Sequence, residues 1–159
     1  GINCISFDMS VLMNNIFTEQ YIGTTLLNYR HDTPAPYLDP KALAEAIEQA
    51  MNREALLNFN IKATGRFQYS IEDVERILES NGYPVTCIET IHNNQLHKNA
   101  GVSADQRLMS DISDDYALGI YPKISTDLSM FGVISRSLED FVEQDSQYFL
   151  NLQAGDKNL

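Results

Sequence analysis

Apolar residues recur at helical spacing after a proline-containing loop, HDTPAP, in the first third of the chain. Asp39 stands at the expected N-cap and Pro40 takes the first helical position, ahead of the strong helix formers KALAEAIEQAM. The pattern predicts a helix whose buried face holds Leu43, Ala46, Ile47 and Ala50.

Capping signals predict further helices. Ser70 and Asp73 form a capping box ahead of an apolar stripe, and Asn81-Gly82 ends that segment. The stripe consists of Ile71, Val74, Ile77 and Leu78. The same signals predict a helix from Ser103 and Gln106 to Leu118, a short turn at Thr126, and a last helix, LEDFVEQDSQYFL, capped by Ser137 with Asp140.

Alternating apolar and polar residues predict strands over Ile2–Phe7, Thr24–Tyr29, Leu56–Ala63 and Val85–Thr90. Ser10 is placed to cap a short helix, VLMNNIF, and residues 92–101 are predicted to be a loop. Long helices and few strands indicate an α/β fold, in which a helical layer is attached to a sheet that this chain only begins.

Charge and composition exclude several classes of protein. The formal net charge of −11 makes nucleic-acid binding unfavourable. No apolar run approaches the ~18–20 residues of a membrane span, and the first ten residues lack signal-peptide features. Cys4 and Cys87 are expected to be buried, reduced thiols, which together indicate a cytoplasmic protein. The three histidines form no ligand cluster, so no metal site is predicted.

Four segments, in this order, resemble the second half of NmrA-like proteins, which are atypical short-chain dehydrogenase/reductases. They are GINCISFDMSVLMNNIF, PYLDPKALAEAIEQAM, LLNFNIKATGRFQYSIEDVERILESNGYPV and FGVISRSLEDFVEQD. The resemblance implies the C-terminal, substrate-side half of a Rossmann-type NAD(P)-binding fold over residues 1–152, followed by a disordered tail at 153–159. The chain departs from the family at Asp8-Met9, where Arg-Pro is usual, and at Ala42, where a second Asp is usual.

The resemblance also carries expectations about cofactor and partner. No strand-Gly-x-x-Gly-x-x-Gly-helix motif is present, and that motif allows the backbone to approach a pyrophosphate. The resemblance implies that the complete protein binds NADP or NAD. Because the motif is missing here, neither cofactor is expected to bind this chain alone. The partner is an N-terminal cofactor-binding half or a second copy of the chain, because strands separated from their sheet expose an edge.

Two functions remain open. The first is the substrate-binding half of an NAD(P)-dependent oxidoreductase that moves hydride to a small carbonyl or quinone. The second is a non-catalytic NAD(P)-sensing regulator or protein-interaction subunit of the same family, which the change to Asp8-Met9 favours slightly.

The resemblance places candidate site residues in the first segment. It assigns cofactor contacts to Phe7, Asp8, Met9 and Ser10, and a substrate pocket to Met13, Asn14 and Phe17. Met13 and Phe17 are also four residues apart, so the alternative is that both belong to the core face of a helix.

Tyr37 and Lys41 match the Tyr-x-x-x-Lys spacing of short-chain dehydrogenases, but Pro40 intervenes and Tyr37 precedes the helix. We interpret this match as coincidence and predict no catalytic residue in the chain.

Overall fold

The computed structural model describes residues 4–29, 33–54, 57–91, 107, 111 and 123–153. The loop expected at 92–101 lies outside these residues, as does most of the helix expected from Ser103 to Leu118. Arg107 and Asp111, inside that predicted helix, are helical. Gln153 ends the last helix, and the remainder of the expected tail also lies outside the description.

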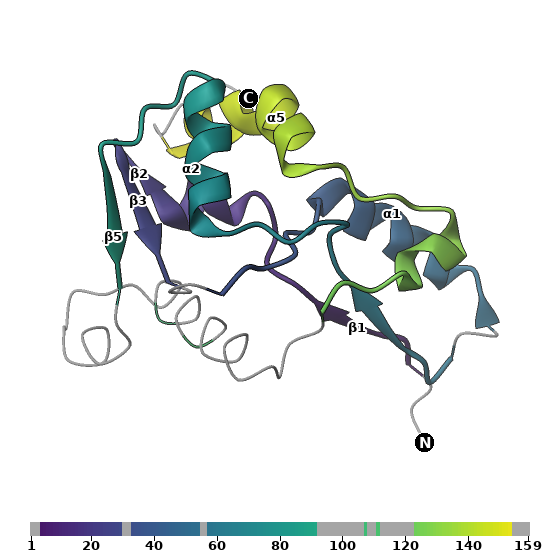
Figure 1. The fold of residues 1–159 in the computed structure, drawn as a ribbon. Helices are drawn as coiled ribbons and strands as arrows, with labels where there is room; N and C mark the ends of the chain where they lie inside the picture. The colour runs from purple at the N-terminus through teal and green to yellow at the C-terminus, as the bar shows by residue number, and fades with distance from the viewer. Residues whose placement is uncertain are drawn as a thin grey trace.

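The described elements form an α/β structure with two small sheets (Figure 1). In chain order they are β1 (Ser6–Met9), the π-helix η1 (Ile16–Gln20), β2 (Tyr21–Ile22), β3 (Thr25–Asn28), α1 (Pro40–Met51), β4 (Asn60–Ala63), α2 (Ile71–Ser80), β5 (Cys87–Thr90), the 3-10 helix η3 (Asp127–Phe131) and α5 (Leu138–Gln153).

One sheet consists of β1 and β4, which run parallel with Ser6 opposite Asn60 and Met9 opposite Ala63. Helix α1 and η3 lie beside it (Figure 1). A hydrophobic core forms between these elements and includes Leu43 and Ala46 of α1, Ile61 of β4 and Phe131 of η3.

The other sheet has the order β2-β3-β5, with β2 antiparallel and β5 parallel to β3. Helix α2 packs over this sheet and contacts α5 (Figure 1). The second and larger core lies here, and includes Leu26 of β3, Leu78 of α2 and Phe141 of α5. The chain therefore builds two cores, one for each sheet.

The capping signals at Asp39, Ser70 and Ser137 are confirmed. The Asp39 carboxylate accepts a hydrogen bond from the Lys41 amide, and Ser70 and Asp73 form both bonds of the capping box. The Ser137 hydroxyl accepts a bond from the Asp140 amide at 3.1 Å ahead of α5. Thr126 is the residue before η3, as expected for a turn of helix.

Several sequence predictions are wrong in detail. The first strand is four residues further along than Ile2, and Leu57 and Asn58 form a turn before β4, with Asn58 at φ 69°. Ile47 is 39% exposed, and Ala42 takes its place on the buried face of α1. The strand β2 was not predicted.

The helix expected at VLMNNIF begins only at Ile16, because the backbone of residues 11–13 instead forms a bridge with Leu38. Leu38 donates its amide to Val11 and accepts a bond from the Met13 amide, which holds Val11 and Leu12 extended. The two cysteines are also misplaced by the sequence analysis, since Cys4 and Cys87 are both exposed free thiols.

Candidate functional site

The residues predicted to contact a cofactor are the last three residues of β1 and the residue that follows it. They lie at the carboxyl end of the parallel β1–β4 pair. Phe7 and Asp8 are half-buried, Met9 is 41% exposed, and Ser10 is buried. The Ser10 amide donates to the Ala63 carbonyl at 2.9 Å, while its hydroxyl has no hydrogen-bond partner among the described residues. A buried hydroxyl without a partner is costly, so this atom is a candidate ligand contact.

The two edges of the β1–β4 sheet differ in whether their backbone amides have hydrogen-bond partners among the described residues. In a parallel ladder successive residues bond to opposite sides, so the bonds of Ser6 to Phe59 and of Ser10 to Ala63 direct the Phe7 and Met9 amides away from β4. No strand of the described residues pairs with that edge of β1.

The far edge of β4 is closed in a different way. The carboxylate of Asp127, at the start of η3, accepts the Lys62 amide at 2.8 Å. The sheet is thus capped on the β4 side and open on the β1 side. An open, in-register edge is a template for another strand.

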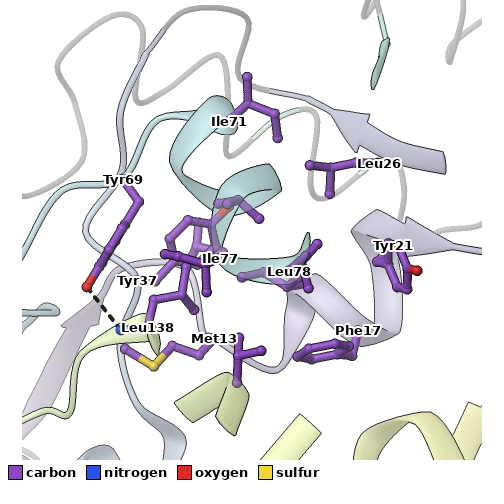
Figure 2. Close-up of a cluster of buried hydrophobic side chains, with 14 of the residues drawn as sticks. Met13, Phe17, Tyr21, Leu26, Tyr37, Tyr69, Ile71, Ile77, Leu78 and Leu138 are labelled. Carbon is purple, nitrogen blue, oxygen red and sulfur yellow. Dashed lines mark hydrogen bonds between the residues drawn. The ribbon is translucent and has the colours of Figure 1, made fainter. Parts of the chain in front are cut away.

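The residues predicted to line a substrate pocket lie next to the larger core. Met13 is 1% exposed and Phe17 is fully buried, and both are part of the hydrophobic cluster in Figure 2. Asn14 is half-buried, and its Oδ1 atom is buried without a hydrogen-bond partner in the described part of the chain. Both side chains therefore belong to the core, although only Phe17 lies in a helix, since η1 begins at Ile16 and Met13 lies in the turn before it. The contact of Met13 and Phe17 with a substrate stays a prediction.

Tyr37 and Lys41 do not form a catalytic pair in this structure. The Tyr37 hydroxyl is buried and donates to the Gln20 side chain at 3.0 Å. The Lys41 ammonium lies at the surface and forms an ion pair with Asp145 at 2.9 Å. Each side chain has its own structural partner, and the interpretation of the Tyr-x-x-x-Lys spacing as coincidence stays a prediction.

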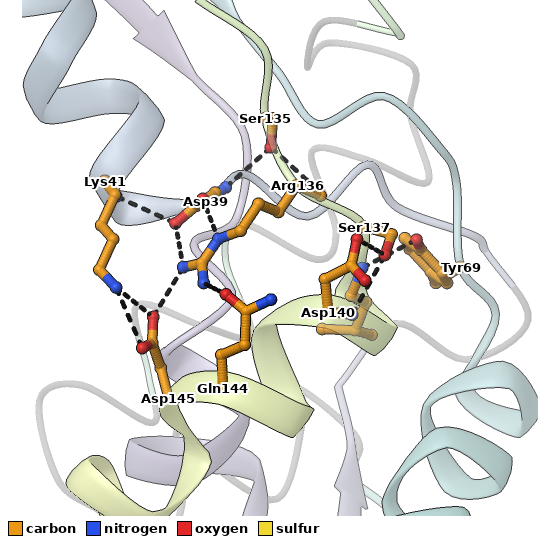
Figure 3. A network of polar contacts seen from close by, with 10 residues as sticks. Asp39, Lys41, Tyr69, Ser135, Arg136, Ser137, Asp140, Gln144 and Asp145 are labelled. Atoms are coloured by element: carbon orange, nitrogen blue, oxygen red, sulfur yellow. Dashed lines mark hydrogen bonds and ion pairs between the residues drawn. The ribbon is translucent and has the colours of Figure 1, made fainter.

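A charged network, which the sequence analysis missed, joins the start of α1 to α5 (Figure 3). The Arg136 guanidinium donates to both carboxylate oxygens of the buried Asp39, at 2.7 and 3.1 Å. It also donates to Asp145 at 2.6 Å and to Gln144 at 2.8 Å. Lys41 completes the network through Asp145.

This network shifts the pKa values of Arg136 and Asp145. The hydrogen bonds to Asp39 raise the pKa of Arg136 further above its usual range, against the effect of burial. Burial would raise the pKa of Asp145, but the hydrogen bonds and charges of Lys41 and Arg136 outweigh it and lower that pKa. Arg136 and Asp145 therefore both stay ionised at neutral pH, and the network has a structural role in holding the start of α1 against α5.

Within the described residues, no group of three or more metal-ligating side chains comes together. None of the described helices is long and apolar enough to cross a membrane.

Solved structures with this fold include an oxidoreductase, an epimerase and a dye reductase. An NADPH-dependent quinone oxidoreductase from Escherichia coli, solved with NADPH, matches 94% of this chain with a TM-score of 0.72 and 13% identity. A nucleoside-diphosphate-sugar epimerase from Staphylococcus aureus matches 91% with a TM-score of 0.70 and 14% identity. A triphenylmethane reductase from Citrobacter matches 86% with a TM-score of 0.64 and 16% identity.

The chain has a Rossmann-like reductase and epimerase fold. It spans about half the length of these proteins, namely 54% of the oxidoreductase, 53% of the epimerase and 48% of the dye reductase. At these identities the likeness is one of fold. No protein-family model and no curated protein matches the sequence.

Proposed function

We propose that this chain is the C-terminal, substrate-side part of an NAD(P)-dependent oxidoreductase, which reduces a small carbonyl or quinone when joined to a cofactor-binding half. The observation that carries the proposal is the edge of β1 that no described strand covers, in a chain that shares its fold with about half of three longer proteins, one of them an NADPH-dependent quinone oxidoreductase. A strand from a cofactor-binding half would pair with that edge and continue the sheet.

The residues at the end of β1 fit one end of a nicotinamide cofactor. The exposed Met9 and the unpartnered hydroxyl of Ser10 stand at the carboxyl end of a parallel strand, where ligands of open α/β sheets bind. Met9 and Ser10, with the backbone of Phe7 and Asp8, would hold the nicotinamide end. The pyrophosphate end needs a glycine-rich turn, which the chain lacks.

The bound cofactor would supply the hydride. The part left to this chain is to position the substrate and to exclude water. Asn14 offers a buried amide oxygen without a hydrogen-bond partner among the described residues, and Met13 and Phe17, which are close to it in the sequence, are buried in the larger apolar core. A mainly apolar site with a few polar groups is the usual composition of a small-molecule pocket.

A non-catalytic NAD(P) sensor is the second candidate, and the Asp8-Met9 pair favours it. Asp8 places a carboxylate beside the proposed nicotinamide contact, at a position where the resembled family has Arg-Pro. The sensor would share the sheet and the cofactor contacts with the oxidoreductase and lack turnover.

The first test measures cofactor binding by nucleotide fluorescence and calorimetry. The 159-residue chain alone should show no saturable NADPH binding at millimolar concentration. Co-expressed with a cofactor-binding half from the adjoining coding sequence, it should bind NADPH, and Met9→Asp should weaken that binding. Saturable micromolar binding by the isolated chain would overturn the proposal.

The second test separates the two candidates. The NADPH-binding complex should oxidise NADPH in the presence of a panel of quinones and small carbonyl compounds. Stoichiometric NADPH binding without turnover of any member of the panel would contradict the oxidoreductase and support the sensor.

A further inference from the structure

A cavity of about 290 Å³ opens beside β4, on the side of the sheet away from β1. Its walls come from the residues that follow β4, from the segment before η3, from η3 itself and from the extended stretch before α5. This volume is near the lower end of the ~300–1,000 Å³ typical of ligand pockets. It suits a small molecule and is too small for a dinucleotide.

The cavity is held open by hydrogen bonds between segments far apart in the chain. The Thr64 hydroxyl accepts the Ser125 amide at 2.8 Å, and the Asp127 carboxylate accepts the Lys62 amide at 2.8 Å. The apolar part of the wall includes Leu128 and Val133, which are buried, and Ile124 and Ile134, which are 47% and 69% exposed. A preformed, mostly apolar hollow results.

Cations surround this hollow. Arg66 lines it directly, and an adjoining recess that shares Ile124, Ser125 and Thr126 is lined by Lys62 and Lys123. Among the described residues, Asp127 is the only carboxylate that lines either space, and it accepts a backbone amide. Arg66, Lys62 and Lys123 have no ion-pair partner in the described part of the chain.

This local excess of positive charge stands out against the rest of the molecule. The whole chain has 11 Lys and Arg against 22 Asp and Glu, so three unpaired cations around one hollow do not reflect a generally basic surface. The Arg66 guanidinium lies over the Phe67 ring, 5.2 Å from its centroid, and no described carboxylate pairs with it. Cations without an ion-pair partner among the described residues, next to an apolar cavity, match a ligand that carries one anionic group on an apolar body. The Arg66 fork suits carboxylate and phosphate oxygens alike.

We propose that this cavity binds a small amphipathic anion, a carboxylate or a phosphate monoester with a short apolar tail. The tail lies against Leu128, Val133 and Ile134, and the head group meets Arg66 with Lys62 and Lys123. The site lies beyond the outer edge of β4, apart from the proposed cofactor contacts at β1. The inference does not depend on the proposed oxidoreductase activity.

The test is a chemical-shift titration of the isotope-labelled chain with hexanoate, hexyl phosphate and hexanol. At least one of the two anions should bind saturably, with shifts centred on the cavity, and hexanol should bind more weakly than that anion. Hexanoate alone would identify carboxylates as the ligand class, and hexyl phosphate alone would identify phosphate monoesters. Failure of both anions to saturate, or equal binding of hexanol, overturns the proposal.

Charge variants provide matched controls. Arg66→Gln with Lys123→Gln should weaken anion binding about five- to tenfold, since each is a rim charge partly screened by solvent. Arg76→Gln removes an exposed cation of α2 outside the cavity and should change the affinity little. Ile134→Glu should weaken binding and Ile134→Lys should strengthen it, at an exposed position where neither disturbs the core. An equal loss in the Arg76 variant, or equal effects of the two Ile134 variants, contradicts the site.

Discussion

Arg136 and Asp39 are 97 positions apart and form a two-pronged ion pair, with Nε–Oδ2 at 2.7 Å and Nη2–Oδ1 at 3.1 Å (Figure 3). Asp39 is also the N-cap of α1, which belongs to the core of the β1–β4 sheet. Arg136 immediately precedes the Ser137 cap of α5, which belongs to the other core. The ion pair therefore links the two cores at the N-terminal ends of α1 and α5.

Arg136→Met should lower the free energy of unfolding by about 3–5 kcal/mol, because the Asp39 side chain is only 4% exposed and its charge would lose its partner. Urea unfolding at neutral pH measures the effect. Asp39→Asn added to this variant should recover part of the loss, since the amide keeps the cap without a buried charge.

Lys41→Met provides the control for that ion pair. It removes the other cation of the network, but the Lys41 side chain is 70% exposed, so the cost should stay below about 1 kcal/mol. Equal losses for the two single variants would contradict the structural role assigned to Arg136.

Tyr69 should give stability that is lost at alkaline pH. Burial, together with the charges of Glu139 and Asp140, raises the pKa of Tyr69 to about 12, although the Leu138 amide donates to its hydroxyl at 3.0 Å and opposes the shift. The unfolded pKa is about 10. The contribution to stability is therefore complete below pH ~10 and is lost as the pH rises toward the folded pKa.

The measurement is tyrosinate absorbance against pH for the natural chain and for Tyr69→Phe. The difference between the two curves isolates one of eight tyrosines and should rise near pH 12. The Phe variant should also show a shallower alkaline loss of thermal stability. A difference curve centred near pH 10 would show that Tyr69 is not buried against Glu139.

Gly65 should not tolerate a side chain, although its backbone is not in the left-handed region. A Cβ at this position would overlap the carbonyl oxygen of Tyr37, so the two backbones touch only because residue 65 is glycine. Gly65→Ala should cost at least about 2–3 kcal/mol of unfolding free energy or prevent folding. Solubility and thermal unfolding measure it.

Gly23→Ala is the matched control, since Gly23 has φ 66° and open space where its Cβ would lie. Its cost should be near 1 kcal/mol, from backbone strain alone. A smaller loss at position 65 than at position 23 would contradict the close contact with Tyr37.

The sequence predicted the features of this fold that are local. The caps at Asp39, Ser70 and Ser137 are confirmed because each depends on residues within one turn of its helix. The exposed Ile47 and the extended Val11 depend on packing partners that periodicity cannot show. Phe7 and Ala63 belong to two of the predicted strands, Ile2–Phe7 and Leu56–Ala63, and the structure places both residues in the parallel β1–β4 pair.

The sites were harder to predict. The ion pair of Asp39 with Arg136 joins two of the family-like segments, but no spacing links residues so far apart in the chain. The cavity beside β4 was missed for the same reason, because Thr64, Ser125 and Val133 come from three separate segments. The only local signal in the sequence was the occurrence of two basic residues, Lys62 and Arg66, with no acidic residue between them in an acidic chain.

The open edge of β1 predicts that this chain associates with another chain or with a second copy of itself. Sedimentation of the isolated chain at low micromolar concentration should show self-association, or a complex once a cofactor-binding half is added. Met9→Pro should abolish the association without unfolding the chain, because the Met9 amide points away from β4 and its side chain is 41% exposed. Asp8→Pro, one residue earlier, removes an amide that faces Ile61 and should destabilise β1 itself. The contrary result is that the natural chain sediments as a monomer, with or without the other half, and unfolds cooperatively. That result would show that the outer edge of β1 is closed in solution, and it would remove the main support for a sheet continued by a cofactor-binding half.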